Sequence, residues 1–263
     1  MQPGVESLIS LVAYGNHFLQ TGDDCRLFLD RHTCFGYIQA INFRERDKRK
    51  WYRLLPTEKI ICNEPADWFS YLKINGYTRI QLHYDMAGDC DWMIRTSNGK
   101  RSVYWQCDWI PVIAINGSRK RFAINCTRVL AQIKPLKGNI AVTACRQQLE
   151  NVLQALVQLY SSYQLNGPAD TFRYALSLLH AAKPESLHYA HDLLPGGEMY
   201  PLPERQLIYA AVAACLPTGK GVWSDMGFGN QAEDRKHTGL LDDLHTAIAL
   251  SIPAAVNTVL VMA

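Results

Sequence analysis

Histidine and aspartate residues in the second half of the chain are of the side-chain types that bind metal ions. His188, His191 and Asp192 lie within five consecutive residues. Further donors are available closer to the C-terminus, at Asp225, His237, Asp242 and His245. Imidazole and carboxylate groups hold catalytic zinc, which activates a water molecule for hydrolysis. Because His-x-x-His alone has low specificity, surface and hydrogen-bonded histidines are the preferred interpretation, and a metal-dependent hydrolase is the alternative.

Other patterns that would indicate catalysis are incomplete. Ser224 precedes Asp225 in a glycine-rich stretch, but no Gly-x-Ser-x-Gly sequence presents it as a nucleophile. Lys220 lacks the glycine spacing of a phosphate-binding loop. The eight cysteines include no Cys-x-x-Cys pair, so neither a zinc knuckle nor a disulfide framework is indicated. We therefore expect a protein that is not an enzyme, with no catalytic residue, no metal and no cofactor.

The most highly charged run, residues 44–50, contains Arg46, Lys48, Arg49 and Lys50. A basic cluster attracts phosphates or acidic protein surfaces, although the acidic residues within the run favour a solvated hairpin tip. Residues 1–137 hold 20 Lys+Arg and 13 Asp+Glu, a net charge of +7. Residues 138–263 hold 7 and 11, a net charge of −4. The two halves would therefore attract different partners.

The first half has the alternation of a mostly antiparallel sheet with flanking helices. Helices are predicted near 5–19 and 65–74, and strands near 35–43, 50–55, 77–84, 91–96, 101–106 and 120–125. Asn98-Gly99 predicts a tight turn in which both residues have positive φ. Trp92, Trp105 and Trp109 lie on or beside this sheet. Packing against a helix is preferred for them, and a nucleic-acid module that stacks bases there, with the basic hairpin, is a further alternative.

Pro135 and Gly138 mark a boundary after which helical periodicity takes over. We predict an α+β protein with a sheet domain over 1–137 and a helical bundle over 138–263. The bundle contains helices near 142–165, 169–182 and 204–215, and a closing helix with an apolar face from Leu240 to Val259. The uncharged stretch 246–263 is expected to be buried in this bundle rather than to span a membrane. No signal peptide is evident, so a cytoplasmic protein is expected.

The loop between the last two predicted helices, residues 219–229, contains four glycines and two aromatic residues. Glycine permits close backbone approach, so such a loop folds tightly around its aromatic side chains. One interpretation is that Trp223 and Phe228 close the end of the bundle and Asp225 caps a turn. The other is that Trp223, Asp225, Met226 and Phe228 contact a partner.

This loop resembles one in long uncharacterised bacterial proteins associated with polymorphic-toxin gene neighbourhoods. Those proteins often end in a helix, a Gly-Gly-Met-Gly-Ser-Trp-Asn-Asp loop and a last helix with an Ala-Val-Asn ending. The matches here are Gly219, Gly221, Trp223, Asp225, Met226 and Ala255-Val256-Asn257, and the departures are Pro217, Thr218, Lys220, Val222 and Ser224. The resemblance covers about the last 120 residues, roughly one domain.

The resemblance implies an immunity protein, an antitoxin of bacterial competition that binds a cognate toxin, such as a type VI secretion effector, and blocks it. It implies no catalytic residues. Inhibition by occlusion needs complementary shape and a few buried anchors. We accordingly expect a toxin protein as the partner, with contacts from Trp223, Asp225, Met226, Phe228 and the basic residues of 44–50. We expect no membrane partner, and nucleic acid is the less favoured ligand.

Overall fold

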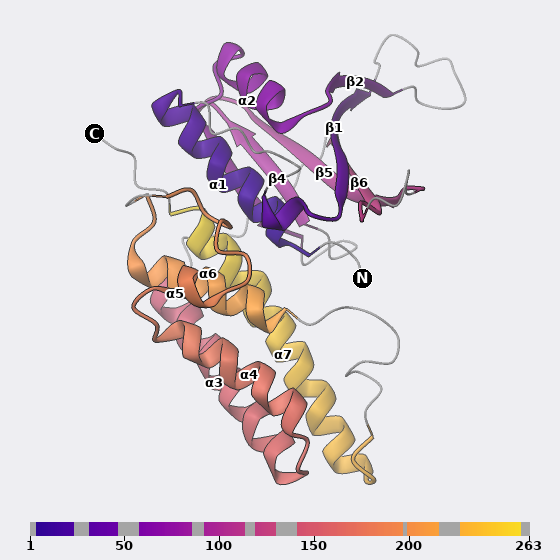
Figure 1. Ribbon diagram of the computed structural model, residues 1–263, viewed down its shortest axis with the longest axis vertical. Helices are drawn as coiled ribbons and strands as arrows, with labels where there is room; N and C mark the ends of the chain where they lie inside the picture. Colours follow the sequence, from indigo (N-terminus) through magenta and orange to yellow (C-terminus); the bar gives the residue numbers. More distant parts are fainter. Residues whose placement is uncertain are drawn as a thin grey trace. The chain divides into compact units, whose positions relative to one another are not determined.

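The computed structural model describes residues 4–23, 32–46, 58–85, 92–113, 119–129, 141–196, 199–215 and 227–258. They form two compact units (Figure 1). The sheet unit comprises the described residues of Val5–Lys137 together with Asp192–Met199. The helical unit comprises those of Gly138–His191 and Tyr200–Thr258. The chain therefore leaves the helical unit after His191, contributes a short segment to the sheet unit, and returns at Tyr200.

The sheet unit is built on six strands in the order β2-β1-β6-β5-β4-β3. The strands β1 and β6 are parallel, and every other neighbouring pair is antiparallel. Its elements are α1 (Glu6–Thr21), the 3-10 helix η1 (Thr33–Phe35), β1 (Ile38–Arg46), β2 (Glu58–Cys62), α2 (Pro65–Ile74), β3 (Arg79–Tyr84), β4 (Trp92–Ser97), β5 (Ser102–Pro111) and β6 (Phe122–Val129). The predicted α+β class, with a mostly antiparallel sheet followed by helices, is confirmed.

Helices α1 and α2 pack on one face of the sheet. At Gly15 of α1, an added Cβ would lie 2.5 Å from Ile80 Cδ1 on β3 and 2.7 Å from Phe69 Cε1 on α2, so any larger side chain there would force these two side chains to shift. The next residue, Asn16, donates from Nδ2 to Ile80 O (2.7 Å) and accepts at Oδ1 from Ile80 N (2.8 Å). Because β3 is an edge strand, this buried amide satisfies backbone groups that have no strand partner.

The core between α2 and the sheet is aromatic. The rings of Phe43 and Trp68 stack with centroids 4.1 Å apart at 8°. Trp105 lies edge-on to both, and its indole nitrogen donates to Thr96 Oγ1 (3.1 Å). These large side chains bury most of their surface, and such burial is the main stabilising contribution in a core of this kind.

Two details of the sheet differ from the sequence prediction. The hairpin of β4 and β5 forms, but Gly99 takes a positive φ (82°) and Asn98 does not. Asn98 Oδ1 instead accepts from the backbone nitrogens of Lys100 (3.1 Å) and Arg101 (2.8 Å), so a side-chain cap replaces the second left-handed residue. The antiparallel partner of β1 in the structure is β2, whereas the predicted strand at 50–55 lies outside the described residues.

The helical unit contains α3 (Val142–Ser162), α4 (Asn166–Leu179), α5 (Pro184–Leu187), α6 (Leu202–Ala214) and α7 (Gln231–Val256). Helices α3, α4, α6 and α7 pack as a bundle in which α3 contacts α4 and α7, and α6 contacts the same two. The predicted apolar face of α3 is buried at Leu149, Val152, Leu153, Leu156 and Tyr160. Residues 166–168, where a helix break is predicted, instead form the first turn of α4, as proline is tolerated there.

Helix α7 is, by length and composition, the one described helix that meets the requirements for crossing a membrane. Half of its most apolar 18-residue window is buried within the protein. Core helices of water-soluble domains often meet the same requirements, so this is weak evidence for a membrane span. Within the stretch 246–258, Ala247, Ile248, Ile252 and Val256 are buried.

Candidate functional site

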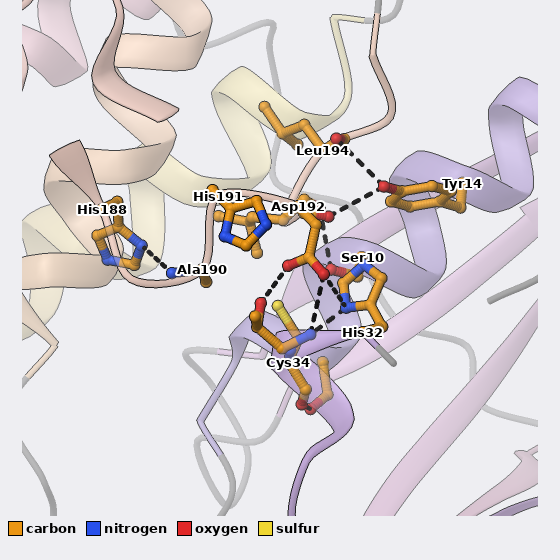
Figure 2. A network of polar contacts seen from close by, with 12 residues as sticks. Ser10, Tyr14, His32, Cys34, His188, Ala190, His191, Asp192 and Leu194 are labelled. Atoms are coloured by element: carbon orange, nitrogen blue, oxygen red, sulfur yellow. Dashed lines mark hydrogen bonds and ion pairs between the residues drawn. The ribbon is translucent and has the colours of Figure 1, made fainter. Parts of the chain in front are cut away.

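The polar cluster of the sheet unit begins at His32, which immediately precedes η1 (Figure 2). Its side chain is buried and lies between two aromatic rings, with centroids 5.4 Å from Tyr14 and 5.0 Å from Phe35. Its Nδ1 accepts from the backbone nitrogen of Cys34 (3.3 Å). The first turn of η1 thus fixes the ring, and both flanking rings limit its rotation.

Asp192 joins this cluster from 159 residues away in the sequence. Its Oδ2 accepts from the backbone nitrogen of Thr33 (2.9 Å), and its Oδ1 accepts from the Thr33 hydroxyl. The distance from Oδ2 to His32 Nδ1 is 3.7 Å. Burial raises the pKa of this carboxyl, but the two hydrogen bonds from Thr33 and the nearby His32 outweigh that effect and leave the pKa below its ordinary value.

Side chains of α1 hold the segment that carries Asp192. Tyr14 donates its hydroxyl to the carbonyl oxygens of Asp192 (3.0 Å) and Leu194 (3.3 Å). Ser10 donates to Leu193 O (2.9 Å). Three successive carbonyl groups of this segment are therefore held by two side chains of one helix face, which places the carboxylate reproducibly.

The third member of the cluster is Cys34. The pKa of its thiol is raised to about 12, chiefly by burial; hydrogen bonds from Ser10 and Thr33 oppose this rise, and the negative charges of Asp192 and Glu6 contribute to it. In this arrangement the thiol is protonated at neutral pH and is not an activated nucleophile. One donor atom each from His32, Cys34 and Asp192 lies within 4.8 Å of the others. In the parts of the chain that the structure describes, this is the one group of three such donors.

Sequence reasoning found one of these three residues. It selected Asp192 but grouped it with His188 and His191, its neighbours in the chain. The short spacing His32-Thr33-Cys34 was the available local signal for the other two. By itself a His-x-Cys pair has little specificity, and no pattern in the sequence connects it to a residue so far away.

The histidines of the helical unit have structural contacts of their own. His188 is 4% exposed, its Nδ1 accepts from Ala190 N (3.1 Å), and burial lowers its pKa to about 4. His237 Nε2 lies 2.7 Å from the Tyr160 hydroxyl, and burial lowers its pKa as well. Both rings are therefore neutral above about pH 6.5, and each is held by a single protein hydrogen bond.

The remaining residues of the sequence-predicted metal set do not join them. His191, Asp242 and His245 are exposed, and Asp225 lies outside the described residues. Asp192 belongs to the sheet unit. Within the described ranges, this set does not form a group of three donors.

Most of the predicted partner contacts fall outside the described residues, namely Trp223, Asp225, Met226, Lys48, Arg49 and Lys50. Arg46 is the last residue of β1. Phe228 is half-buried, with ring centroids 4.7 Å from Tyr163 and 4.9 Å from His237, and its backbone nitrogen donates to Asp234 Oδ1 (2.7 Å). The ring of Phe228 thus packs on the bundle itself, as the structural interpretation of the loop predicts.

Of the three sheet tryptophans, Trp105 is too deeply buried to stack a base. Trp105 is 1% exposed beneath α2, and Trp92 is half-buried with its ring edge-on to Tyr84 (4.8 Å). The strand register places Trp92, Trp105 and Trp109 on the face that α1 and α2 cover. Trp105 therefore packs against a helix, which is the interpretation that the sequence favours over base stacking.

A second candidate site is a surface at one end of the central strands, which we call the sheet-end patch. Backbone hydrogen bonds from Arg121 N to Tyr37 O (2.9 Å) and from Val112 N to Arg121 O (2.8 Å) bring its segments together. Large apolar side chains are unusually exposed here, at 57% for Tyr37, 42% for Ile110 and 90% for Ile113. The name covers Tyr37, Ile110, Ile113, Arg119, Lys120 and Arg121, which lie on these neighbouring segments at the ends of β1, β5 and β6.

The sequence of the strands explains why Ile110 protrudes. In β5 it lies directly opposite Ala123 of β6, which in turn lies opposite Ala40 of β1. The two alanines are too small to cover it. Its members come from three separate stretches of the chain, so no local pattern in the sequence connects them.

Comparison of the chain with protein-family models, curated proteins and solved structures gives no significant match.

Proposed function

We propose that this protein is an immunity-type protein that binds a toxin protein and neutralises it by covering a surface the toxin needs. The observation that carries the proposal is the sheet-end patch. Exposed large apolar side chains grouped beside arginines mark protein interfaces more often than isolated exposed residues do. Tyrosine and arginine are also the types enriched among residues that dominate binding energy.

The charge of the patch indicates the partner's character. Arg119 and Arg121 are exposed, and Lys120 is half-buried beside them. Basic residues beside exposed apolar side chains favour an acidic partner surface, because opposite potentials accelerate encounter and exclude partners of like charge. The net charge of +7 over residues 1–137 extends this positive field beyond the patch. The toxin surface that docks here is therefore expected to be acidic at its edge and apolar at its centre.

The C-terminal loop and the basic run near residue 48 remain predicted contacts. Both come from the sequence and the resemblance, and the residues concerned lie outside the described ranges. Binding by two separate surfaces is compatible with inhibition by occlusion, in which a few well-buried anchors supply most of the affinity.

The test is binding of the tagged protein to the product of the adjacent gene, together with a growth assay in which the two are co-expressed. If that product kills cells alone and is harmless in a stable complex, the immunity function is supported. We expect Ile113→Asp and Tyr37→Ala each to weaken binding at least about ten-fold, since loss of an interface anchor costs about 2 kcal/mol.

A matched control is available in Ile74, which ends α2 and is 84% exposed outside the patch. Ile74→Asp should bind the toxin as the wild type does. If the patch variants protect cells fully and Ile74→Asp does not, the patch is the wrong surface. If the adjacent product neither binds nor kills, the immunity proposal fails.

A further inference from the structure

We propose that His32, Cys34 and Asp192 bind a divalent transition-metal ion of the zinc type. This site is independent of the sheet-end patch, and the sequence alone predicts no metal in this protein. The proposal rests on three donors of different chemistry brought together by η1 and the segment from Asp192 (Figure 2).

The donor set matches the ligands that zinc takes. Imidazole nitrogen, thiolate sulfur and carboxylate oxygen bind Zn²⁺ at about 2.0–2.3 Å, so donors around one tetrahedral ion lie roughly 3.5 Å apart. The pair of His32 Nδ1 and Asp192 Oδ2 is already 3.7 Å apart. The widest donor separation in the group is at most 4.8 Å, so closure needs a shift of about 1 Å, within reach of a χ1 adjustment.

The surroundings hold two of the ligands in place before any ion arrives. The His32 ring lies between Tyr14 and Phe35, and both oxygens of Asp192 accept hydrogen bonds from Thr33. Outer contacts of this kind orient metal ligands and increase their affinity for the ion. Each carboxylate oxygen has a second lone pair, so the bonds from Thr33 leave a position for the ion.

Binding replaces one protein contact and releases one proton. His32 Nδ1 exchanges its long contact with Cys34 N (3.3 Å) for the metal. The Cys34 thiol loses its proton to solvent as the sulfur–metal bond forms, and the thiolate and carboxylate then balance the charge of the divalent ion. A thiolate with an imidazole selects zinc over magnesium and calcium, which prefer oxygen ligands. Three protein ligands leave a fourth position for water.

The competing interpretation is that Asp192 serves only to cap η1 through Thr33. The test uses the full-length chain after metal removal, titrated with Co²⁺, which substitutes for zinc and gives a thiolate-to-cobalt charge-transfer band in the near ultraviolet. We expect one equivalent of Co²⁺ to bind with this band, Zn²⁺ to displace it, and the melting temperature to rise with added zinc.

Substitutions assign the ligands. Cys34→Ser should abolish the band, and Asp192→Asn should weaken zinc binding at least ten-fold while its amide oxygen still accepts from Thr33 N. The control is Cys62→Ser, a buried cysteine of the same unit that belongs to no donor group in the described residues, and it should leave both the band and the affinity unchanged.

A folded wild-type chain that gives no charge-transfer band overturns the proposal, whatever the variants do. So does a band that persists in Cys34→Ser, or zinc affinity that is the same in Asp192→Asn and in the wild type. Far-ultraviolet circular dichroism of each variant checks that the fold is retained. Because the wild-type result alone is decisive, failure of one variant to fold does not remove the test.

Discussion

His32 of the sheet unit and His237 of the helical unit are both buried, at 8% and 2% exposure, yet their surroundings differ. His32 has a thiol and a carboxylate within a few ångströms. His237 has the Tyr160 hydroxyl at 2.7 Å and the rings of Tyr160 and Phe228 around it. One setting offers several donors to an ion, and the other satisfies a single nitrogen inside an aromatic core.

The difference lies in how each setting is assembled. The His32 cluster depends on contacts between α1, η1 and the segment from Asp192, which lie far apart in the chain. The His237 pair joins α3 and α7, two helices whose apolar faces the sequence predicts, although His237 precedes the predicted face of α7, which begins at Leu240. Burial of a histidine therefore says little about function until its neighbours are known.

The largest expected effect is on the packing of α1 against β3; α1 is also the helix that holds the segment of Asp192. Asn16→Ala removes both hydrogen bonds to the backbone of Ile80 and leaves a buried N–H and a buried C=O on the β3 edge. Each unsatisfied group costs about 1–3 kcal/mol, so a loss of about 4 kcal/mol in the free energy of unfolding is expected in urea titration.

The control for this prediction is Asn75→Ala, which removes an exposed hydrogen bond to Tyr71 O (2.7 Å) at the end of α2. It should cost less than about 1 kcal/mol. Equal losses in the two variants would show that the amide of Asn16 does not support β3.

The next largest effect is on the pH dependence of the free energy of unfolding, through the buried neutral histidines. Burial holds the pKa of His188 at about 4, below its ordinary 6.5. The neutral ring stabilises the fold fully above about pH 6.5, and this contribution is lost as pH falls toward 4, because the unfolded chain takes up the proton first. The loss attributable to this group is up to about 3 kcal/mol.

His188→Gln should flatten the fall in stability between pH 6.5 and 4, measured by urea unfolding at several pH values. His83 of the sheet unit has a pKa also lowered to about 4, by burial and by Arg95, so His83→Gln should flatten it in the same direction. A pH slope that is unchanged in His188→Gln would contradict the neutral, buried assignment of that ring.

The smallest effect is at the His237 pair. Tyr160→Phe removes the hydroxyl and leaves His237 Nε2 without this bond in a buried position, so a loss of about 1–2 kcal/mol is expected. Tyr163, on the same side of the bundle and 39% exposed, gives the control. Tyr163→Phe should change the free energy of unfolding by less than about 0.5 kcal/mol. Neither variant should alter cobalt binding if the proposed metal site lies at His32.

The elements that the sequence predicts well are those with a strong local period. The apolar positions of α3 and of Leu244, Ile248, Ile252 and Val256 on α7 are buried as expected, since a period near 3.6 residues identifies a helix face without knowledge of its partner. The hairpin at Asn98-Gly99 is also predicted, because an Asn-Gly pair between two alternating stretches is a local turn signal. The details of its turn differ because an asparagine side chain can cap a turn as well as adopt a positive φ.

Pairing between distant segments was harder to predict. The parallel pairing of β1 with β6 joins strands about 80 residues apart, and hydrophobic alternation does not encode which strands become neighbours. The sheet-end patch follows from that pairing, since Tyr37 and Val112 both hydrogen-bond to the backbone of Arg121, the residue before β6.

By itself, the sequence determined the α+β class, the helix faces, the main hairpin and the contrast in charge between the two halves. Composition and short-range periodicity are properties of neighbouring residues, so they can be read without a fold. Only the tertiary structure decided that Asp192 hydrogen-bonds to Thr33 beside His32 and Cys34, and does not form a site with His188 and His191, which precede it in the sequence. Such a contact depends on how α1 packs against a returning segment, and the packing energy that selects it has no local signature in the chain.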